Sequence, residues 1–376
     1  MKVAMVLESF DRRAGGVAVH VKELTEFLTR SGVDVEIITS SWSDIDAGVP
    51  VHRIKGPKDP FFRLNVSPWA SRELRTLIEK GDFDIVHAHH AFSRTPLSGI
   101  SVGRELGIRT VLTTHTVSFM PEHEYLWSVL SYSYPVYRIM LSKADRIIAV
   151  SSAAENFISY FTDVPVTVIP NGVDTSFFRP VSAEYAREQM GFDSSPSFLY
   201  VGRLVSKKGL FTLLFAFRSV KKEIPQARLR IAGDGRFKTI LSSMARALGI
   251  DDSVDFMGYV PYDKLNLLFS SADVFVLPSS FGESFGIVLI EAMASGTPVI
   301  GTRVGGIVEI LDEGEYGVLV SPSIPEELSE AMIHLMKDKE KRNALAERAL
   351  KMVREKYDWK VVTEKVIKLY EESDVS

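Results

Sequence analysis

The sequence has no cysteine among its 376 residues. A chain without cysteine forms no disulfide, offers no thiolate to a metal and has no cysteine nucleophile. Glutamine is also scarce, with Gln189 and Gln226 the only two, and this scarcity weakly indicates a thermophilic source. No apolar run approaches the ~20 residues of a membrane span, and the N-terminal stretch lacks the cleavage site of a signal peptide. We therefore expect a cytoplasmic protein.

A strong excess of one charge is also missing. The formal net charge of −4 argues against a nucleic-acid-binding protein, because such proteins usually carry a basic surface. Hydrophobic residues make up 45% and charged residues 24% of the chain, as in ordinary globular proteins. The length suits two domains of about 150–200 residues each.

Several catalytic motifs are missing as well. The sequence has no G-x-S-x-G elbow of a serine hydrolase and no complete nucleotide-binding glycine loop. His87, His89 and His90 are the nearest approach to a metal-binding group. Neighbouring residues on a strand point to opposite faces, however, and no carboxylate completes a ligand motif. We therefore predict no metal site.

The sequence instead alternates short apolar strands with amphipathic helices. This rhythm predicts parallel sheets covered by helices on both faces, an α/β fold. It breaks at Pro170–Asp174, in a turn-rich segment, and restarts at Phe198–Val201. We place a domain boundary at this break, with residues 1–169 before it and the second domain starting at residue 170. Helices are expected near Trp69–Glu79, Pro96–Leu106, Tyr125–Leu141, Pro325–Glu355 and Trp359–Glu372.

The stretch Pro278–Ile300 holds the most informative local pattern. A buried strand, Val274–Leu277, leads into a loop of small residues that ends at Gly286. An apolar helix, Ile287–Ala294, follows the loop. The start of a helix offers unpaired N–H groups and a partial positive charge, so this junction is suited to an anionic ligand.

Two glutamates flank that junction, Glu283 in the loop and Glu291 inside the apolar helix. Their spacing of eight residues carries little information, because Glu347/Glu355 and Glu364/Glu372 share it. Their surroundings are more informative, because a charge within an apolar segment needs a partner. That partner is either a structural hydrogen bond or a ligand, and paired carboxylates suit the adjacent hydroxyls of a sugar or a ribose.

The turn Gly202–Gly209 follows a strand and carries Arg203 and Lys208. Two cations before a helix suit a diphosphate, since arginine can bind two oxygens at once and lysine adds a mobile charge. The alternative is a solvated basic turn, which is how we interpret Lys207.

Weaker signals come from Gly16, His115 and Gly233. Gly16 opens a helix, and Gly233 follows a strand. At each position the glycine either lets a phosphate approach the backbone or is an ordinary loop residue. His115 ends the strand Thr110–Thr114 and is either a ligand-facing residue or a satisfied core histidine. Gly16, His115, Arg203 and Glu283 all follow strands, and ligands of open α/β sheets lie beyond the carboxyl ends of strands.

Two aromatic segments are candidates for contact with a membrane surface, and for one of them the question stays open. The loop Pro60–Leu64 lies near Arg53, Lys55 and Lys58 in the sequence, and a basic aromatic surface suits peripheral membrane contact. The segment Tyr125–Tyr137 fits core packing better.

Taken in order, eight short motifs along the whole chain resemble the GT-B-fold retaining glycosyltransferases of family 4, which include phosphatidylinositol mannosyltransferases. The motifs are Gly15-Gly16, the strand end Asp84–His89, Thr114-His115, Ile169–Asp174, Gly202-Arg203 with Lys208-Gly209, Gly233–Gly235, Pro278–Ala292, and Gly301 with Gly305-Gly306.

The resemblance implies two Rossmann-like domains that face a central cleft and close over the substrates. It implies that the last helix, within residues 358–376, returns to the first domain, so that the second domain ends at residue 357. Arg203 and Lys208 would bind the diphosphate of the donor, and Glu291 would hold the ribose.

For the sugar itself, the resemblance implies that Glu283 and the backbone N–H groups of Phe285 and Gly286 bind its hydroxyls. His115 would face the sugar and the acceptor, and Gly16 would meet the phosphate or the acceptor.

The activity implied is transfer of a hexose from a UDP- or GDP-linked sugar to a hydroxyl of a lipid, saccharide or polyol, with retention and without a metal or other cofactor. With a lipid acceptor, the protein would work at the inner membrane face. Two alternatives stay open: a nucleotide-sugar epimerase of the same fold, and a sensor that binds a nucleotide sugar without turnover.

Overall fold

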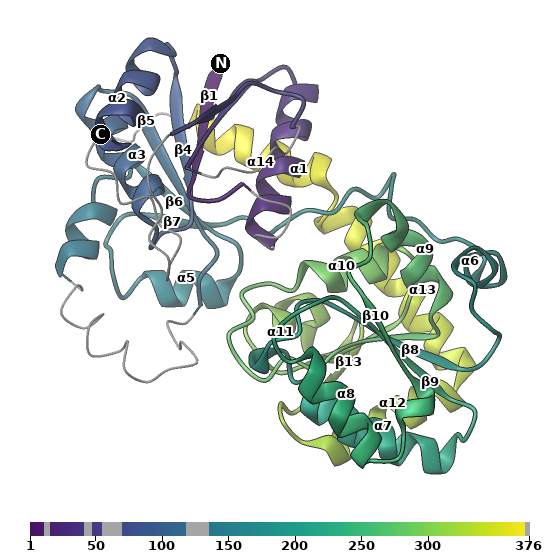
Figure 1. Ribbon diagram of the computed structural model, residues 1–376. Helices are drawn as coiled ribbons and strands as arrows, with labels where there is room; N and C mark the ends of the chain where they lie inside the picture. The colour runs from purple at the N-terminus through teal and green to yellow at the C-terminus, as the bar shows by residue number, and fades with distance from the viewer. Residues whose placement is uncertain (11–15, 41–46, 55–69, 118–134, 373–376) are drawn as a thin grey trace. The chain divides into compact units, whose positions relative to one another are not determined.

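The chain forms two units, each built on one parallel sheet (Figure 1). The structure is a computed structural model that describes residues 1–10, 16–40, 47–54, 70–117 and 135–372. The first unit is Met1–Gly172 together with Trp359–Ser376, and the second is Val173–Asp358. The sequence analysis places the division a few residues earlier. Within the described residues, no helix combines the length and apolar character needed to cross a membrane.

The first unit has a seven-stranded sheet in the order β3-β2-β1-β4-β5-β6-β7. Its strands are β1 (Lys2–Leu7), β2 (Asp34–Thr39), β3 (Val51–Arg53), β4 (Ile85–His89), β5 (Arg109–Thr114), β6 (Arg146–Ala149) and β7 (Val166–Val168). Its labelled helices are α1 (Gly16–Arg30), α2 (Ala70–Lys80), α3 (Arg94–Glu105), α5 (Ser152–Ile158) and α14 (Trp359–Glu371).

Alternate residues of β1 build two separate cores on the two faces of this sheet. Val3, Met5 and Leu7 pack with α1 and α14, whereas Ala4 and Val6 pack with α2 and α3. Figure 1 shows α14 (yellow) beside α1 (purple), and the two helices are in contact. The predicted parallel sheet with helices on both faces is therefore confirmed.

The same alternation fixes where the histidines of β4 point. Met5 pairs with His87 and Leu7 with His89 across the parallel ladder, so both imidazoles share the α1/α14 face. His87 Nδ1 lies 2.6 Å from the Tyr370 hydroxyl of α14. His87 and His89 are both fully buried.

The second unit has a six-stranded sheet in the order β10-β9-β8-β11-β12-β13. Its strands are β8 (Ser197–Val201), β9 (Arg228–Ala232), β10 (Val254–Gly258), β11 (Val274–Leu277), β12 (Val299–Thr302) and β13 (Val318–Val320). Its helices are α6 (Ala183–Met190), α7 (Leu210–Glu223), α8 (Lys238–Ala247), α9 (Leu265–Ser271), α10 (Ile287–Ala294), α11 (Gly306–Leu311), α12 (Pro325–Lys337) and α13 (Lys339–Lys356). Short 3₁₀ turns are η1 (Ser206–Lys208), η2 (Asp251–Ser253), η3 (Tyr262–Lys264) and η4 (Asp312–Gly314).

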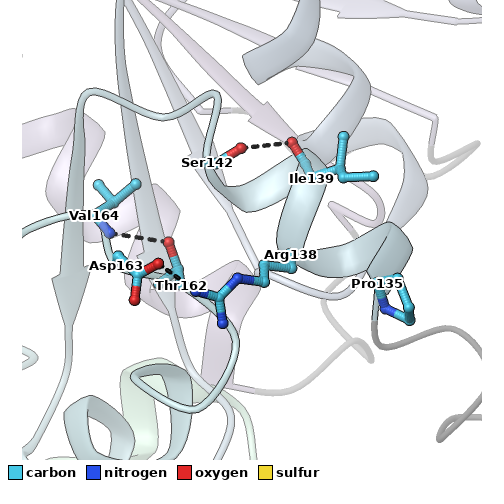
Figure 2. A pocket seen from close by; sticks show the side chains of 7 residues that line it. All are labelled: Pro135, Arg138, Ile139, Ser142, Thr162, Asp163 and Val164. Atoms are coloured by element: carbon cyan, nitrogen blue, oxygen red, sulfur yellow. Dashed lines mark hydrogen bonds and ion pairs between the residues drawn. The ribbon is translucent and has the colours of Figure 1, made fainter.

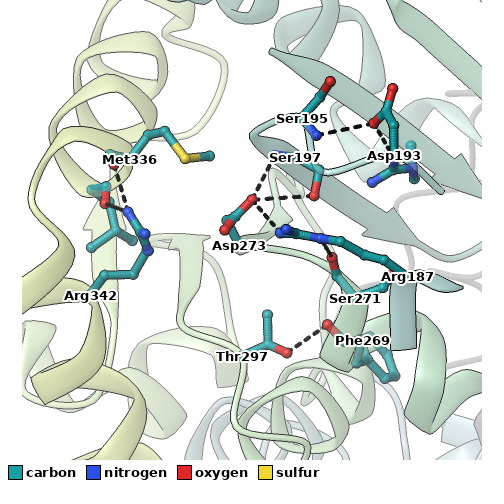
Figure 3. Close-up of polar contacts among 12 residues, drawn as sticks. Arg187, Asp193, Ser195, Ser197, Phe269, Ser271, Asp273, Thr297, Met336 and Arg342 are labelled. Atoms are coloured by element: carbon teal, nitrogen blue, oxygen red, sulfur yellow. Dashed lines mark hydrogen bonds and ion pairs between the residues drawn. The ribbon is translucent and has the colours of Figure 1, made fainter. Parts of the chain in front are cut away.

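A polar network ties the amino ends of β8 and β11 to α6 (Figure 3). The Asp273 carboxylate accepts hydrogen bonds from the Ser197 backbone N–H at 2.8 Å and from the Arg187 guanidinium at 2.9 Å. Arg187 also donates to the Ser271 carbonyl at 2.9 Å. Because Asp273 is satisfied by these donors at the strands' amino ends, the network anchors the fold at the sheet edge opposite the predicted ligand-binding loops.

Two expected helices differ in detail from those observed, and one observed helix was not expected. The charged segment expected over Pro325–Glu355 is split at Asp338, whose backbone is not helical and whose carboxylate caps α13 through Lys341 N–H at 2.9 Å. Of Tyr125–Leu141, only residues 135–141 are described, and they are helical. Helix α6 was not expected, because its single buried residue, Ala186, gives it no apolar stripe.

Candidate functional site

Neighbouring strands bring four loops together at the carboxyl edge of the second sheet. The loops follow β9, β8, β11 and β12, which are consecutive in the sheet. All these strands are parallel, so their carboxyl ends share one edge. Residues from distant parts of the sequence can therefore meet there.

The glycines of these loops allow the backbones to approach each other closely. A Cβ on Gly233 would lie 1.9 Å from the Gly202 carbonyl oxygen, and one on Gly209 would lie 1.7 Å from the Pro278 oxygen. Both glycines have positive φ angles, 135° and 67°. Side chains are excluded at these positions, so Gly233 has a structural reason to be glycine, whether or not it also faces a ligand.

Lys208 and Glu283 form a buried ion pair at this edge. Lys208 Nζ lies 2.5 Å from Glu283 Oε2, and the side chains are only 13% and 11% exposed. Ser279 donates a second hydrogen bond to the same carboxylate oxygen at 2.9 Å. Lys207 reaches the same loop and donates to the Gly282 carbonyl at 3.1 Å. The structure thus brings two predicted site residues into direct contact.

The electrostatics keep this pair charged. Burial alone would raise the pKa of Glu283, but the charge and hydrogen bond of Lys208, aided by Lys207 and Ser279, bring that pKa below its ordinary value. Burial lowers the pKa of the Lys207 ammonium; Glu283 opposes this shift, and the charge on Lys208 adds to it. Glu283 is therefore an ionised, oriented acceptor of hydrogen bonds at neutral pH.

The loop after β12 fixes the backbone of Glu283. Gly306 N–H donates to the Glu283 carbonyl at 3.1 Å. A Cβ on Gly305 would lie 1.9 Å from that same carbonyl oxygen, and Gly305 has a φ of 50°. The pair Gly305-Gly306 therefore positions Glu283 by letting the two loops touch.

Replacing Gly305 with alanine is expected to lower the free energy of unfolding by about 2–4 kcal/mol, because the methyl group clashes with backbone at a strained φ. Chemical denaturation measures this loss. Gly249→Ala is the matched control, since Gly249 has a similar φ of 68° with nothing within 4 Å; strain alone should cost about 1 kcal/mol. Equal losses in the two variants would contradict the contact.

The start of α10 lies directly after Glu283. Gly286 precedes the helix with a φ of 97°. Within the described part of the chain, the N–H groups of Phe285 and Gly286 make no hydrogen bond. The Phe285 ring is buried against Tyr357, with ring centroids 5.6 Å apart. The Phe285 side chain is therefore taken up by packing, and what it leaves at the helix start is its backbone N–H group, next to that of Gly286.

The remaining predicted residues occupy different surroundings. Arg203 is exposed on the loop after β8, where its carbonyl accepts a hydrogen bond from the buried Tyr200 hydroxyl at 2.9 Å. Glu291 is buried in α10, with 5% exposure. Gly16 begins α1, and His115 follows β5; both belong to the first unit. Gly15 lies outside the described residues.

The sequence analysis discounts His87, His89 and His90 as a metal-binding group. In the structure the rings of His87 and His89 lie together, with centroids 4.2 Å apart. His87 is engaged by Tyr370 and, through Nε2, by Thr113 at 2.6 Å. His90 lies 3.0 Å from the Ser93 hydroxyl. His89 also lies beside His115 and His20 of α1.

The buried histidines predict acid sensitivity. Burial lowers the pKa of His87 to about 3 and that of His20 to about 4, with the neighbouring charge of His20 adding to the shift of His87. Between those values and about 6.5 the unfolded chain binds more protons, so stability is full above pH 6.5 and falls as the pH drops. At pH 5 each histidine should cost about 2 kcal/mol.

Urea unfolding in metal-free buffer at pH 7.5, 6 and 5 measures this dependence, and hydrogen exchange assigns the loss to the first unit. The exposed His334 supplies a control, since His334→Ala should leave the slope unchanged. A stability independent of pH over this range would contradict the neutral buried state.

A separate cavity of about 580 Å³ lies in the first unit (Figure 2). Its lining includes Pro135, Ile139 and Val164, and Arg138 forms an ion pair with Asp163 at its rim. The cavity holds none of the predicted site residues. Volume alone therefore does not make it the functional site.

The sequence analysis missed Ser279 and His20. Ser279 is recognisable only once Glu283 is known to fold back on it. His20 lies on the buried stripe of α1, with Val21 and Leu24, and a polar residue on that stripe was a usable signal. The loop Pro60–Leu64 and the segment 125–134 lie outside the described residues, so the predicted membrane contact stays a prediction.

Comparisons with known proteins match both parts of the chain. The model of "Glycosyl transferases group 1" matches residues 183–352, and that of "Glycosyltransferase Family 4" matches residues 14–177. An uncharacterized glycosyltransferase of Methanocaldococcus jannaschii is 30% identical over 398 aligned residues, covering 98% of both chains. A phosphatidyl-myo-inositol mannosyltransferase of Mycolicibacterium smegmatis is 29% identical, covering 99% of this chain and 94% of the relative.

Solved structures show the same fold. A sucrose-phosphate synthase from Thermosynechococcus elongatus superposes with a TM-score of 0.81 at 23% identity, covering 98% of each chain. Anabaena HepE in complex with UDP-glucose gives 0.79 at 21% identity, covering 98% of this chain and 99% of that one. The predicted GT-B architecture is thereby confirmed.

Proposed function

The chain belongs to the glycosyl transferases of group 1 and family 4, and from this membership we propose that it moves a hexose from a UDP- or GDP-linked sugar to a hydroxyl acceptor with retention of configuration. The observation that carries the proposal is the buried Lys208–Glu283 ion pair beside the start of α10. The loops at this edge of the sheet offer a cation, an oriented carboxylate and N–H groups without a hydrogen bond to any described residue. This combination suits a diphosphate joined to a polyol.

The cations act on the donor's leaving group. Arg203 and Lys208 bind the diphosphate and stabilise the negative charge that develops as the bond from the sugar C1 to the phosphate oxygen breaks. These side chains supply the positive charge that a metal supplies in other transferases, so the proposed reaction needs no metal or other cofactor.

The carboxylates hold the two ends of the donor. Glu283 and the N–H groups of Phe285 and Gly286 bind hydroxyls of the transferred sugar, and Glu291 binds the ribose. Gly233 and Gly16 allow close approach of backbone to the donor and acceptor. His115 faces the acceptor side. The acceptor oxygen attacks C1 on the face that the diphosphate leaves, and a departing phosphate oxygen takes the acceptor's proton.

For the acceptor we propose a polyol hydroxyl of the inositol type, in free or lipid-linked form. The names of two relatives, a D-inositol 3-phosphate glycosyltransferase and a phosphatidyl-myo-inositol mannosyltransferase, support this class. With a lipid-linked acceptor the enzyme would work in the cytoplasm, peripherally at the inner membrane face.

Incubation with a panel of UDP-, GDP- and ADP-sugars and inositol-type acceptors tests the proposal. Free nucleotide diphosphate together with a glycosylated product, in the presence of a chelator, is the expected result. NMR of the new linkage should show the anomeric configuration of the donor. An inverted linkage or dependence on added metal would overturn the mechanism.

The same incubation separates the alternatives. An epimerised sugar without acceptor glycosylation would indicate an epimerase. Tight binding of a nucleotide sugar without turnover would indicate a sensor.

A further inference from the structure

Three histidines from different elements converge on one face of the first sheet. His20 comes from α1, His89 from the end of β4, and His115 from the residue after β5. The ring centroids are 5.5 Å apart for His20 and His89, 4.8 Å for His20 and His115, and 6.0 Å for His89 and His115. One ring nitrogen from each lies within 4.8 Å of the others.

These rings have nitrogens with no hydrogen bond to any described residue. The unpaired atoms are both nitrogens of His20, Nδ1 of His89 and Nε2 of His115. The Asn171 side chain lies beside His20 and opposes the lowering of its pKa through a hydrogen-bonding interaction, although the Asn171 side-chain oxygen and both His20 nitrogens have no partner in hydrogen-bond geometry among the described residues. Buried polar atoms normally have partners, so a cluster of this kind needs an explanation.

Other histidines of the chain show the contrast. Both nitrogens of His87 are engaged, by Tyr370 and Thr113. His52 lies 2.6 Å from Glu36, and His90 is paired with Ser93. Among the residues that the structure describes, the buried ring nitrogens without a hydrogen bond therefore all belong to the three rings that face one another.

The three imidazoles determine which metal ions this cluster would bind. Neutral imidazoles bind zinc, cobalt, nickel and copper, whereas Mg²⁺ and Ca²⁺ prefer oxygen. Zinc binds three histidines at about 2.0–2.1 Å, which places their nitrogens about 3.4 Å apart. Rotations of the three rings toward one another would close the present spacing.

We propose that His20, His89 and His115 bind one divalent transition-metal ion, with Zn²⁺ the best-suited occupant. The His20 ring packs against Trp359, with centroids 5.3 Å apart, and His89 Nε2 lies 3.4 Å from Met5 Sδ. These neighbours leave His89 Nδ1 for the metal and shield the site on two sides. His115 as a residue is half-buried, but its unpaired Nε2 is buried.

The site goes beyond the proposed transfer, which uses no metal. A metal on His115 would take away a ring nitrogen that faces the acceptor side. We therefore expect Zn²⁺ to inhibit transfer reversibly, whereas Mg²⁺ has no effect. This consequence rests on the proposed function; the binding itself does not.

Titration of the untagged, chelator-treated full chain with Co²⁺ tests the binding directly. The expected result is one ion per chain, with the visible absorption bands of nitrogen-ligated Co²⁺ that Zn²⁺ displaces. His115→Ala should weaken binding by more than about 100-fold, since even second-shell changes cost 10–100-fold. The exposed His334→Ala variant is the matched control and should bind as the wild type does.

Thermal unfolding with and without Zn²⁺ tests the same binding in variants that fold poorly. Zn²⁺ should raise the Tm of the wild type and of His334→Ala by mass action, and should leave the Tm of His20→Ala and His115→Ala unchanged. The proposal would be overturned if the wild type showed no Co²⁺ absorption bands, or if both His20→Ala and His115→Ala retained them. Because these readouts need no turnover, they stay decisive even if no sugar donor is found.

Discussion

Replacing Glu283 with alanine is expected to lower kcat/KM for sugar transfer by on the order of 10³-fold, or about 4 kcal/mol. The carboxylate is ionised, oriented by Ser279 and paired with Lys208, so its loss removes an acceptor for sugar hydroxyls and frees a cation. Steady-state kinetics with the donor found in the panel measures the effect.

Two controls separate site chemistry from folding. Glu347→Ala removes an exposed glutamate that also has a second glutamate eight residues away, and it should leave transfer unchanged. Glu283→Ala also leaves Lys208 buried without its partner, at a cost of about 3–5 kcal/mol in unfolding free energy. Adding Lys208→Met should recover stability without activity. Unchanged transfer in folded Glu283→Ala would remove Glu283 from the site.

Replacing Arg203 with alanine is expected to lower kcat by about 10²–10³-fold while leaving stability within about 0.5 kcal/mol. The side chain is exposed and forms no ion pair with the described residues, so its charge is available for a diphosphate. Lowered kcat with unchanged Tm is the signature of a residue used for the reaction and not for the fold.

Arg203→Lys and Arg246→Ala complete this series. Lysine keeps the charge but loses the two-pronged geometry, so it should restore only part of the rate. Arg246 is 80% exposed on the same unit, and its removal should have no effect on kcat. Equal rates for Arg203→Ala and Arg246→Ala would show that Arg203 is a solvated loop residue.

The strands were predictable because a parallel sheet buries both faces and demands continuous apolar runs. Val274–Leu277 shows this: its four residues are all buried. Glu283 and Lys208 were predictable as separate candidates from their positions after strands. Their pairing was not, because it joins residues 75 apart in sequence through a strand order that local patterns do not encode.

Other features depend on contacts that the sequence does not show. Gly305 has to be glycine because another loop's carbonyl occupies the space of its side chain. His20 was recognisable as a polar residue on the apolar stripe of α1, but only the fold reveals that His89 and His115 face it. The break at Asp338 escaped notice because charged residues continue through it.

The return of α14 to the first sheet sets the order in which the protein matures on the ribosome. Trp359, Val362, Val366, Leu369 and Tyr370 complete the core begun by Val3, Met5 and Leu7. Translation of Val173–Asp358, at 5–20 residues per second, takes roughly 10–40 s. Throughout that interval one apolar face of the nascent first unit is covered by α1 but lacks α14, and the apolar surface left open is a target for chaperones. The second unit has no such dependence, so it can reach its native state before the unit that precedes it.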